Sequence, residues 1–448
     1  MPEILALLQT IAPLVSKTIL RQMSHVIYGM LVASGRITML GLARWTEKGG
    51  SYRTLQRWYY AELPWKAIHW LLFRLKFLKA EEEYLIAGDE VVASKAGKAT
   101  FGLDRFFSSI QQRVISGLSF FTFSLVNVHE ERSYPLQVTQ VVKSAEEKAA
   151  SKAKKTAQTP AEKRPPGRPK GSKNKVKQEV SLNPELLRIQ AALKSLLKTI
   201  GAILSLKYVV LDGHFGNYPS AFMVRETNLH LISKMRSDVA LYEAFDGKYA
   251  GKGPRPKYGK KLDVRHLDDD KYLKATSTEK NILTKIYQGT FYNKEFAFAL
   301  NVVGILKTNL LTNAQAHVVL FCTDLELDYE KIIKYYSLRF QIEFNFRDAK
   351  QYWGLEDFMN VKETAVTNAA NLSLFMVNVS YALLKPLREH TPDYSVLDLK
   401  SHYRGLRYAH ETIKMLPQKP DAFLLADIFQ QITRLGAIHP ALLPPTSQ

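Results

Sequence analysis

The segment YYSLRFQIEFNFRDAK, residues 335–350, is rich in aromatic side chains, lacks glycine and proline, and carries charges at regular intervals. This composition predicts one continuous helix. At about 100° per residue, Tyr336, Arg339, Glu343 and Lys350 fall within roughly one sixth of its circumference. Asp348 lies about 120° from Tyr336 and does not join them. The segment therefore predicts a helix with one carboxylate on a stripe of phenolic and basic side chains.

Two aspartates upstream of this segment follow apolar, β-rich runs. LIAGDEVVAS (85–94) places Asp89 at the end of a strand, and YVVLDGHFGN (208–217) places Asp212 directly after a buried one. Asp324, in FCTDLELD, is a third acid at a strand end. An aspartate at such a position is most often a cap or turn residue, so each needs support from elsewhere in the chain. We treat Lys95 and His214 as neighbours of a site rather than as members of it.

The composition excludes several classes of protein. With 448 residues, 46% apolar and 23% charged, the chain is long enough for several domains. A formal net charge of +20 favours nucleic acid as partner, ahead of an anionic membrane surface. The apolar run at 372–384 is too short to span a bilayer and contains Asn378 and Ser380. The single cysteine, Cys322, excludes an internal disulfide and a Cys-based zinc finger. Because Glu3 stands where a signal peptide would carry a basic residue, we expect an intracellular protein.

The order of the predicted elements indicates a fold class. Strands at 84–94, 118–128 and 134–142 suggest a meander, followed by a helix from 183, a strand at 207–213, a helix near 218–228 and a strand at 229–235. This succession is typical of a ribonuclease H-like core. We therefore expect an α/β (α+β) chain whose core holds a mixed five-stranded sheet.

Further segments surround and interrupt that core. A mainly β insertion is predicted before the charged helix, and one more strand at 317–324 follows it. The predicted division is a helical N-terminal domain (1–78), a first part of the core (79–142), a basic flexible linker (143–182), a second part of the core (183–235), a β-rich insertion (236–315), a final part of the core with the charged helix (316–385) and a helical C-terminal region (386–448).

The N-terminal region contains two short helices joined by the KGGS turn, as a helix-turn-helix would. Arg53 and Arg57 would lie on the early turns of the second helix, within reach of base edges or phosphates. A helical hairpin in which Trp58 and Tyr59 belong to the core is the equally weighted alternative.

The linker carries twelve lysines and arginines against three glutamates between residues 143 and 177, and few large apolar side chains. Such a segment is expected to be disordered when free. Within it, RPPGRPKGSKNK (164–175) resembles an AT-hook, with Arg168 in the DNA minor groove and Lys170 beside it. Pro166 stands where that motif usually has arginine, so nonspecific phosphate binding is the alternative.

The spacing Tyr-x2-Arg-x3-Glu-x6-Lys resembles the signature of bacterial insertion-sequence transposases of the DDE type. YYSLRFQIEFNFRDAKQYWGLEDF is similar to the family segment along its length, except that Phe340 stands where tryptophan is common. The settings of Asp89 and Asp212 are similar to the family's first and second motifs. The resemblance implies that Asp89, Asp212 and Glu343 are the catalytic, metal-binding residues. It places Tyr336, Arg339 and Lys350 on DNA phosphates.

The chemistry of DNA cleavage explains why three carboxylates are needed. Attack on a phosphodiester requires an activated hydroxyl and a stabilised leaving oxygen, and two Mg²⁺ ions serve both needs. Hard oxygen ligands suit Mg²⁺, and Mn²⁺ is expected to substitute. Tyr336 and Arg339 could instead form part of an amphipathic seam.

The resulting expectation is a cut-and-paste DNA transposase that binds double-stranded DNA at transposon ends and at the target. The resemblance implies a homodimer in the synaptic complex, in the nucleoid-associated cytoplasm of a prokaryote, with no membrane partner. Two alternatives remain: a catalytically idle, transposase-derived DNA-binding protein, and a ribonuclease H-fold nuclease.

Overall fold

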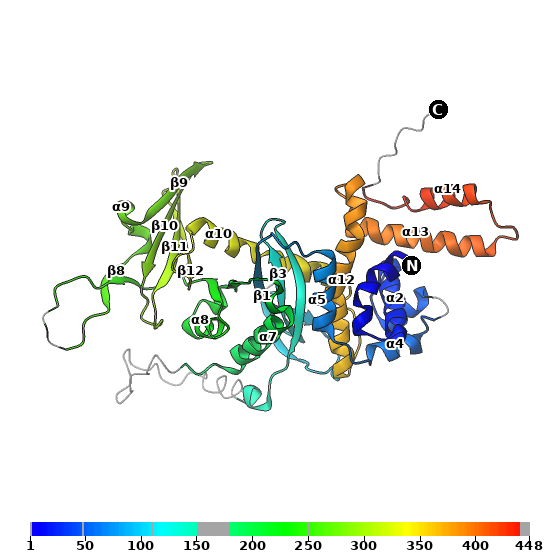
Figure 1. Cartoon of the computed structure of the whole chain (residues 1–448), viewed down its shortest axis with the longest axis horizontal. Coiled ribbons are helices and arrows are strands. Elements are labelled where there is room, and N and C mark those ends of the chain that lie inside the picture. Colours follow the sequence, from blue (N-terminus) through cyan, green and yellow to red (C-terminus); the bar gives the residue numbers. More distant parts are fainter. Residues whose placement is uncertain are drawn as a thin grey trace.

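The computed structural model describes residues 2–46, 49–108, 111–149, 180–249, 251 and 253–439. It is a mixed α/β protein in which a large mixed sheet is covered by helices (Figure 1). Among these residues, no helix is long and apolar enough to cross a membrane.

Helices form the two ends of the chain. Ser16, Thr38 and Ser51 each cap a helix by accepting a hydrogen bond from a backbone N–H of its first turn. The N-terminal helices are α1 (Pro2–Leu8), η1 (Gln9–Leu14), α2 (Lys17–Val32), α3 (Met39–Trp45), α4 (Tyr52–Tyr59) and α5 (Trp65–Lys76). The C-terminal ones are α12 (Glu363–His390), α13 (Val396–Met415) and α14 (Ala422–Ile432).

The middle of the chain supplies the strands and the remaining helices. The strands are β1 (Tyr84–Ser94), β2 (Asp104–Ser108), β3 (Arg113–Asn127), β4 (Arg132–Val141), β5 (Tyr208–Val210), β6 (His230–Lys234), β7 (Leu241–Ala244), β8 (Tyr258–Leu262), β9 (Leu273–Glu279), β10 (Ile282–Phe291), β11 (Leu300–Asn309) and β12 (Gln315–Cys322). The helices are α7 (Pro184–Ile200), η2 (Gly201–Ile203), η3 (Gly213–Phe215), α8 (Tyr218–Arg225), η4 (Val264–His266), α9 (Asp269–Tyr272), α10 (Tyr329–Leu338) and α11 (Gln341–Gln351).

The order of strands in the large sheet is β2-β3-β1-β5-β6-β12-β11-β10-β9, with β4 also paired to β3. β1, β5 and β6 are parallel, whereas β3 and β12 run antiparallel to their neighbours β1 and β6. The carboxyl ends of β1, β5 and β6 therefore lie at one edge of the sheet, together with the amino ends of β3 and β12. We call this the carboxyl edge.

The β-rich insertion differs from the prediction. Rather than forming a subdomain beside a five-stranded core, β9, β10 and β11 continue the same sheet through β12, making ten strands within the described residues. β7 and β8 form a separate two-stranded sheet. β2 was not predicted, so the first strands are four rather than three. Backbone pairing explains the difference, because β12 offers β11 a long antiparallel partner that the sequence pattern does not reveal.

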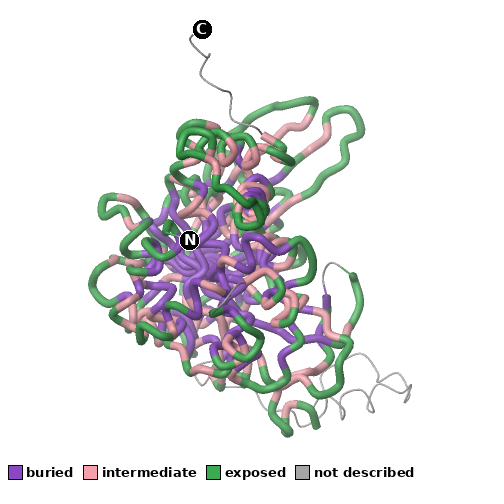
Figure 2. Tube along the Cα trace, turned by 90° about the vertical axis from the view of Figure 1, so that its right-hand side faces the viewer, coloured by how far each residue is buried: buried purple, intermediate pink, exposed green. Residues whose placement is uncertain are grey.

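Helices α5 and α12 both pack on β4, and the other N-terminal helices lie on the far side of α12 (Figure 1). Asn368 of α12 joins this helix to the N-terminal region: its side-chain oxygen accepts from Trp65 Nε1 at 2.7 Å, and its amide donates to the carbonyls of Tyr59 and Ala61. Side chains of α12 belong to the main core, and Figure 2 shows the buried segments at the centre of the molecule. The N-terminal helices are thereby attached to α12 through a buried polar contact as well as through apolar packing.

Helices α3 and α4 are two short helices separated by a turn, as predicted. Trp58 and Tyr59 are buried, which the helical-hairpin alternative required, and Arg53 and Arg57 are exposed. The aromatic side chains of α4 therefore belong to the core. DNA contact by its two exposed arginines stays a prediction.

Asn368→Ala is expected to lower the free energy of unfolding by about 3 kcal/mol, because it leaves Trp65 Nε1 and two carbonyls without partners in the core. Thermal melts followed by circular dichroism measure the change. Asn371→Ala is the matched control, since the buried Asn371 amide donates to the Thr367 carbonyl of its own helix. Equal losses in the two variants would contradict a joining role for Asn368.

Candidate active site

The register of the parallel strands brings Asp89 and Asp212 to the same level. Val210, the last residue of β5, pairs with Ala87, and each aspartate lies two residues further along. The prediction that Asp89 ends its strand was wrong, because β1 continues for five residues to Ser94. β3 supports this extension along its whole length, whereas β5 stops. Asp89 therefore lies where β1 loses one of its two neighbouring strands, which leaves its side chain room at the carboxyl edge.

Asp212 follows β5 and caps the short helix η3. Its Oδ1 accepts from the backbone N–H of His214, and its carbonyl accepts from Ser233 Oγ on the next strand. These contacts hold the backbone of Asp212 in place, and the capping contact does not use its Oδ2.

The charged segment does not form the single predicted helix. It consists of α10 and α11, joined at Arg339 and Phe340 by a tighter turn. The N–H groups of Phe340, Ile342 and Glu343 each donate to the carbonyl three residues earlier. α10 packs on β6 and β12, while α11 packs on β1, β4 and α12. One straight helix cannot cover both surfaces, so the stripe deduced for a continuous helix does not hold across the junction.

Arg339 lies at this junction and contacts two of the three carboxylates. Its Nη1 donates to Asp89 Oδ2 at 2.7 Å, and its Nη2 to Glu343 Oε1 at 3.3 Å. The Arg339 side chain is 15% exposed and Asp89 21%, whereas Glu343 is 44% exposed. Residues 250 positions apart are thus joined by one partly buried guanidinium.

Burial raises the pKa of the Asp89 carboxyl to about 6, even though the charge of Arg339 opposes the rise. The nearby charges of Asp212 and Glu343 raise it further. Burial is the main cause of the raised pKa, and the two neighbouring acids add to it.

Tyr336 extends the site into a cleft of about 680 Å³ that Asp212 and Arg339 also line. Burial raises the pKa of the Tyr336 hydroxyl, so it remains a neutral donor. Lys234, the last residue of β6, and Arg236, just after it, line the same cleft, and sequence reasoning missed both. The sequence pattern could have indicated them, because they lie at the end of β6, a buried strand parallel to the one that Asp212 follows.

Lys350 is separated from this group. Its Nζ donates to the Val92 carbonyl of β1 at 2.7 Å and pairs with Glu356 at 3.0 Å. A phosphate contact for Lys350 stays a prediction, and here the residue holds α11 against the extension of β1.

Asp324, the third acid predicted at a strand end, does not belong to this site. Asp324 accepts from Tyr208 Oη at 2.8 Å, and Tyr208 begins β5 whereas Asp212 follows its end. Asp324 is therefore at the opposite edge of the sheet. His214 pairs with Glu185 at 3.4 Å, and Lys95 donates to the carbonyls of Glu356 and Phe358, so both contact other partners than the three carboxylates.

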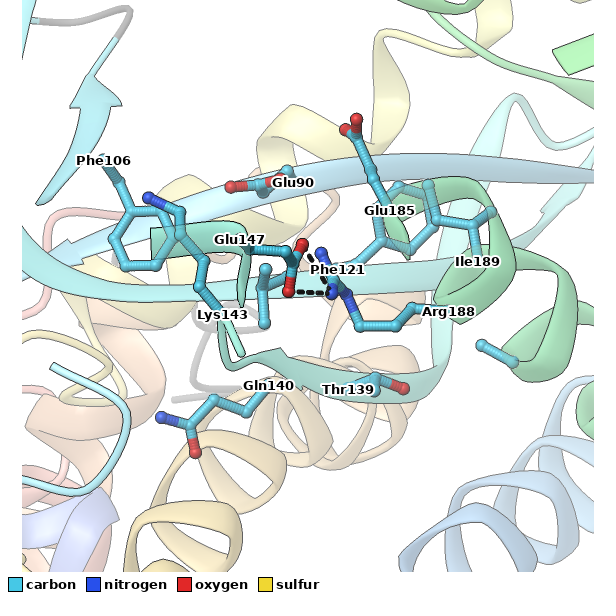
Figure 3. Close-up of a pocket in the computed structure, with 12 residues that line it drawn as sticks. Glu90, Phe106, Phe121, Thr139, Gln140, Lys143, Glu147, Glu185, Arg188 and Ile189 are labelled. Carbon is cyan, nitrogen blue, oxygen red and sulfur yellow. Dashed lines mark hydrogen bonds and ion pairs between the residues drawn. The ribbon is translucent and has the colours of Figure 1, made fainter. Parts of the chain in front are cut away.

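A cavity of about 240 Å³ lies close to the site in sequence but on the other face of the sheet (Figure 3). Glu90 lines it, and neighbouring residues of a strand point to opposite faces. Across the cavity, Glu147 and Arg188 are paired at 2.9 Å. Asp89 is not among the residues that line this cavity.

The donor set suits a divalent cation, because all three side chains offer the oxygen ligands that Mg²⁺ prefers. The Arg339 guanidinium already places one positive charge against Asp89 and Glu343. Within the described parts of the chain, no three His, Cys, Asp or Glu side chains stand close enough together to hold a metal ion. Because Arg339 contacts Asp89 and Glu343, a metal ion shared by these two acids competes with it for their oxygens.

The remaining predicted contacts lie away from the carboxyl edge or beyond what is described. Arg53 and Arg57 are exposed on α4. Arg168 and Lys170, the AT-hook-like residues, fall outside the described residues.

A comparison with protein families bears on this site. A family model described as a DDE superfamily endonuclease matches residues 11–288. The match includes Asp89 and Asp212 and ends before Glu343. No curated protein matches the chain.

Asp89→Asn is expected to raise the melting temperature at pH 8, by about 2 °C, with a smaller gain at lower pH. An aspartate whose folded pKa is about 6 and whose unfolded pKa is near 3.9 costs stability when ionised. That cost is absent below the lower value and complete above the higher one. Melts between pH 4.5 and 8 test this, with the exposed Asp246→Asn as control; a gain independent of pH would contradict it.

Proposed function

The chain belongs to the DDE superfamily endonucleases, and on this premise we propose that it is a DNA transposase of the insertion-sequence type. Family membership implies a nuclease that acts on DNA. The observation that carries the finer proposal is the contact of Arg339 with both Asp89 and Glu343, beside Asp212. It joins two acids of the proposed catalytic set, and the charge of the third, Asp212, is near enough to raise the pKa of Asp89. The mixed sheet is well suited to a ribonuclease H-like core.

In this proposal Asp89, Asp212 and Glu343 hold two Mg²⁺ ions. When bound, the ions activate the attacking hydroxyl and stabilise the leaving oxygen of the phosphodiester. The three carboxylates come from separate elements: β1 carries Asp89, Asp212 follows β5, and α11 carries Glu343.

Positively charged and phenolic side chains around the acids serve the phosphates. Tyr336, Lys234 and Arg236 line the cleft beside Asp212 and suit a DNA backbone. Arg339 neutralises Asp89 and Glu343 in the metal-free protein. When it withdraws, its planar guanidinium can hold a phosphate near the scissile bond.

The wider assignments belong to the same proposal. The N-terminal helices and the basic segment at 143–182 bind the element ends, and the strands from 236 to 315 border the DNA. Joining two ends calls for a homodimer in the synaptic complex.

The central test uses a supercoiled plasmid that carries the gene with its native flanks, incubated with Mg²⁺ or Mn²⁺. We expect strand cleavage and joined 3′ ends from the wild type, and neither from Asp89→Asn, Asp212→Asn or Glu343→Gln. Asp324→Asn, at the opposite sheet edge, is the control and should keep activity. Cleavage that survives one of the three substitutions would remove that residue from the site, and cleavage without joining would indicate a plain nuclease.

Arg339→Gln tests the metal proposal without measuring activity. The variant should be less stable than the wild type in the absence of metal, because two nearby carboxylates lose their shared cation. Mn²⁺ should then raise its melting temperature more than that of the wild type, since ligand binding stabilises the folded state. Arg236→Gln, in the same cleft but paired with Asp238, is the control. Equal Mn²⁺ shifts in all three proteins would count against the site.

A further inference from the structure

A second hollow opens at the carboxyl edge, on the other side of the carboxylates from Lys234 and Arg236. It measures about 940 Å³ and lies between the end of β1, the start of β3 and the loop after α11. A neighbouring hollow of about 570 Å³ shares Arg36 and Met359 with it and continues to α3 and α4. We call the two together the hairpin groove.

Cations dominate the hairpin groove. Arg36, Lys98 and Arg113 line it and are exposed. Among the described residues none of the three forms an ion pair; Arg113 Nε donates to the neutral side chain of Gln111. Arg44 adds a fourth exposed cation at the α3 end. Within the described parts of the chain, the groove therefore presents cations that form no ion pair with a carboxylate.

The two acids that line the same groove are engaged in the protein. Glu356 pairs with Lys350 at 3.0 Å, and Asp357 Oδ2 accepts from the backbone N–H of Ile37 at 3.0 Å. Their charge is partly offset by these contacts. The field in the groove is consequently set by the free cations, and an anionic partner is the one it attracts.

The wall of the groove is held in place before any partner arrives. Lys95 Nζ donates to the carbonyls of Glu356 and Phe358 and lies 3.6 Å from the centre of the Phe358 ring. This ties the end of β1 to the loop after α11. The Asp357 contact with Ile37 ties that loop in turn to the segment before α3. Little ordering is then needed when a partner binds.

The groove lies close enough to the acids for one DNA duplex to contact both. Ser94 lines the groove and lies five residues beyond Asp89 on the same strand, or about 17 Å along it. In B-form DNA this distance corresponds to about five base pairs. Sheet order places the cleft with Lys234, the two aspartates and the groove in sequence along one edge.

From this arrangement we infer that the hairpin groove binds the backbone of double-stranded DNA about five base pairs from the scissile phosphate. The duplex runs from Lys234 and Arg236, past the carboxylates and along the part of β1 beyond Asp89, to Arg36, Lys98 and Arg113, and on toward α3. Exposed Tyr52 and Met359 lie along the continuation and suit contact with sugars. The inference rests on the proposed function for its substrate and assigns residues that the nuclease site does not include.

The test is DNA binding in EDTA, where no cleavage takes place. A fluorescent 40-base-pair duplex of arbitrary sequence is titrated with the full chain from 50 to 300 mM salt. Replacing Arg36, Lys98 and Arg113 together by glutamine should reduce the slope of log K against log salt by about 2.7, and weaken binding about tenfold or more at the lower salt concentrations. Lys98→Gln alone, on an exposed turn, should reduce the slope by about 0.9 and covers the case that the triple variant fails to fold.

A matched triple variant replaces Lys207, Lys331 and Lys334, exposed at the opposite sheet edge, by glutamine. It removes the same charge and should leave the slope nearly unchanged. Equal slopes for the groove variant and the wild type, or equal losses in both triple variants, would overturn the inference. The binding assay needs no catalysis, so it can fail or succeed independently of the cleavage test. If the groove binds DNA but the protein never cleaves the plasmid, the proposed function is refuted and the inference about the groove holds.

Discussion

The structure depends on the gathering of like charges at the carboxyl edge of the sheet. Asp89 and Asp212 are brought level by the parallel register of β1 and β5, and Glu343 reaches them from α11. Burial works against ionisation there and raises the pKa of Asp89. The partly buried Arg339 guanidinium is the contact that balances two of these charges. In the proposed function, an arginine that can exchange carboxylate for phosphate keeps the acids together before metal ions and DNA bind.

The scaffold around this contact is made rigid by polar as well as apolar contacts. The turn between α10 and α11 allows each helix to cover its own part of the sheet, and it directs Arg339 and Glu343 to the edge where β5 ends. The N-terminal helices pack on α12 and are joined to it through the buried Asn368 side chain. In the proposed function, DNA held by those helices therefore stands in a fixed relation to the acids.

The distribution of charge complements this geometry. The positive side chains of the cleft and of the hairpin groove flank the three acids along one edge. DNA laid along that edge meets cations before and after the negatively charged centre, so phosphate binding on both sides offsets the repulsion at the acids. The large insertion, which continues the sheet through β12, lengthens the edge rather than forming a separate body.

Local sequence determined the type of most elements and the identity of the candidate acids. Alternation and apolar runs predicted β1, β3, β4, β5 and β6, and the spacing in YYSLRFQIEFNFRDAK singled out Tyr336, Arg339 and Glu343, because periodicity and residue chemistry are encoded locally. The break between α10 and α11 and the joining of the insertion to the core sheet were decided by tertiary packing. Each depends on partners distant in the chain: two sheet surfaces for the helices, and β12 for the insertion. The separation of Asp324 from the site, the bridging by Arg339 and the alignment of Arg36 with Lys98 and Arg113 follow for the same reason, since strand order places side chains that no local pattern connects.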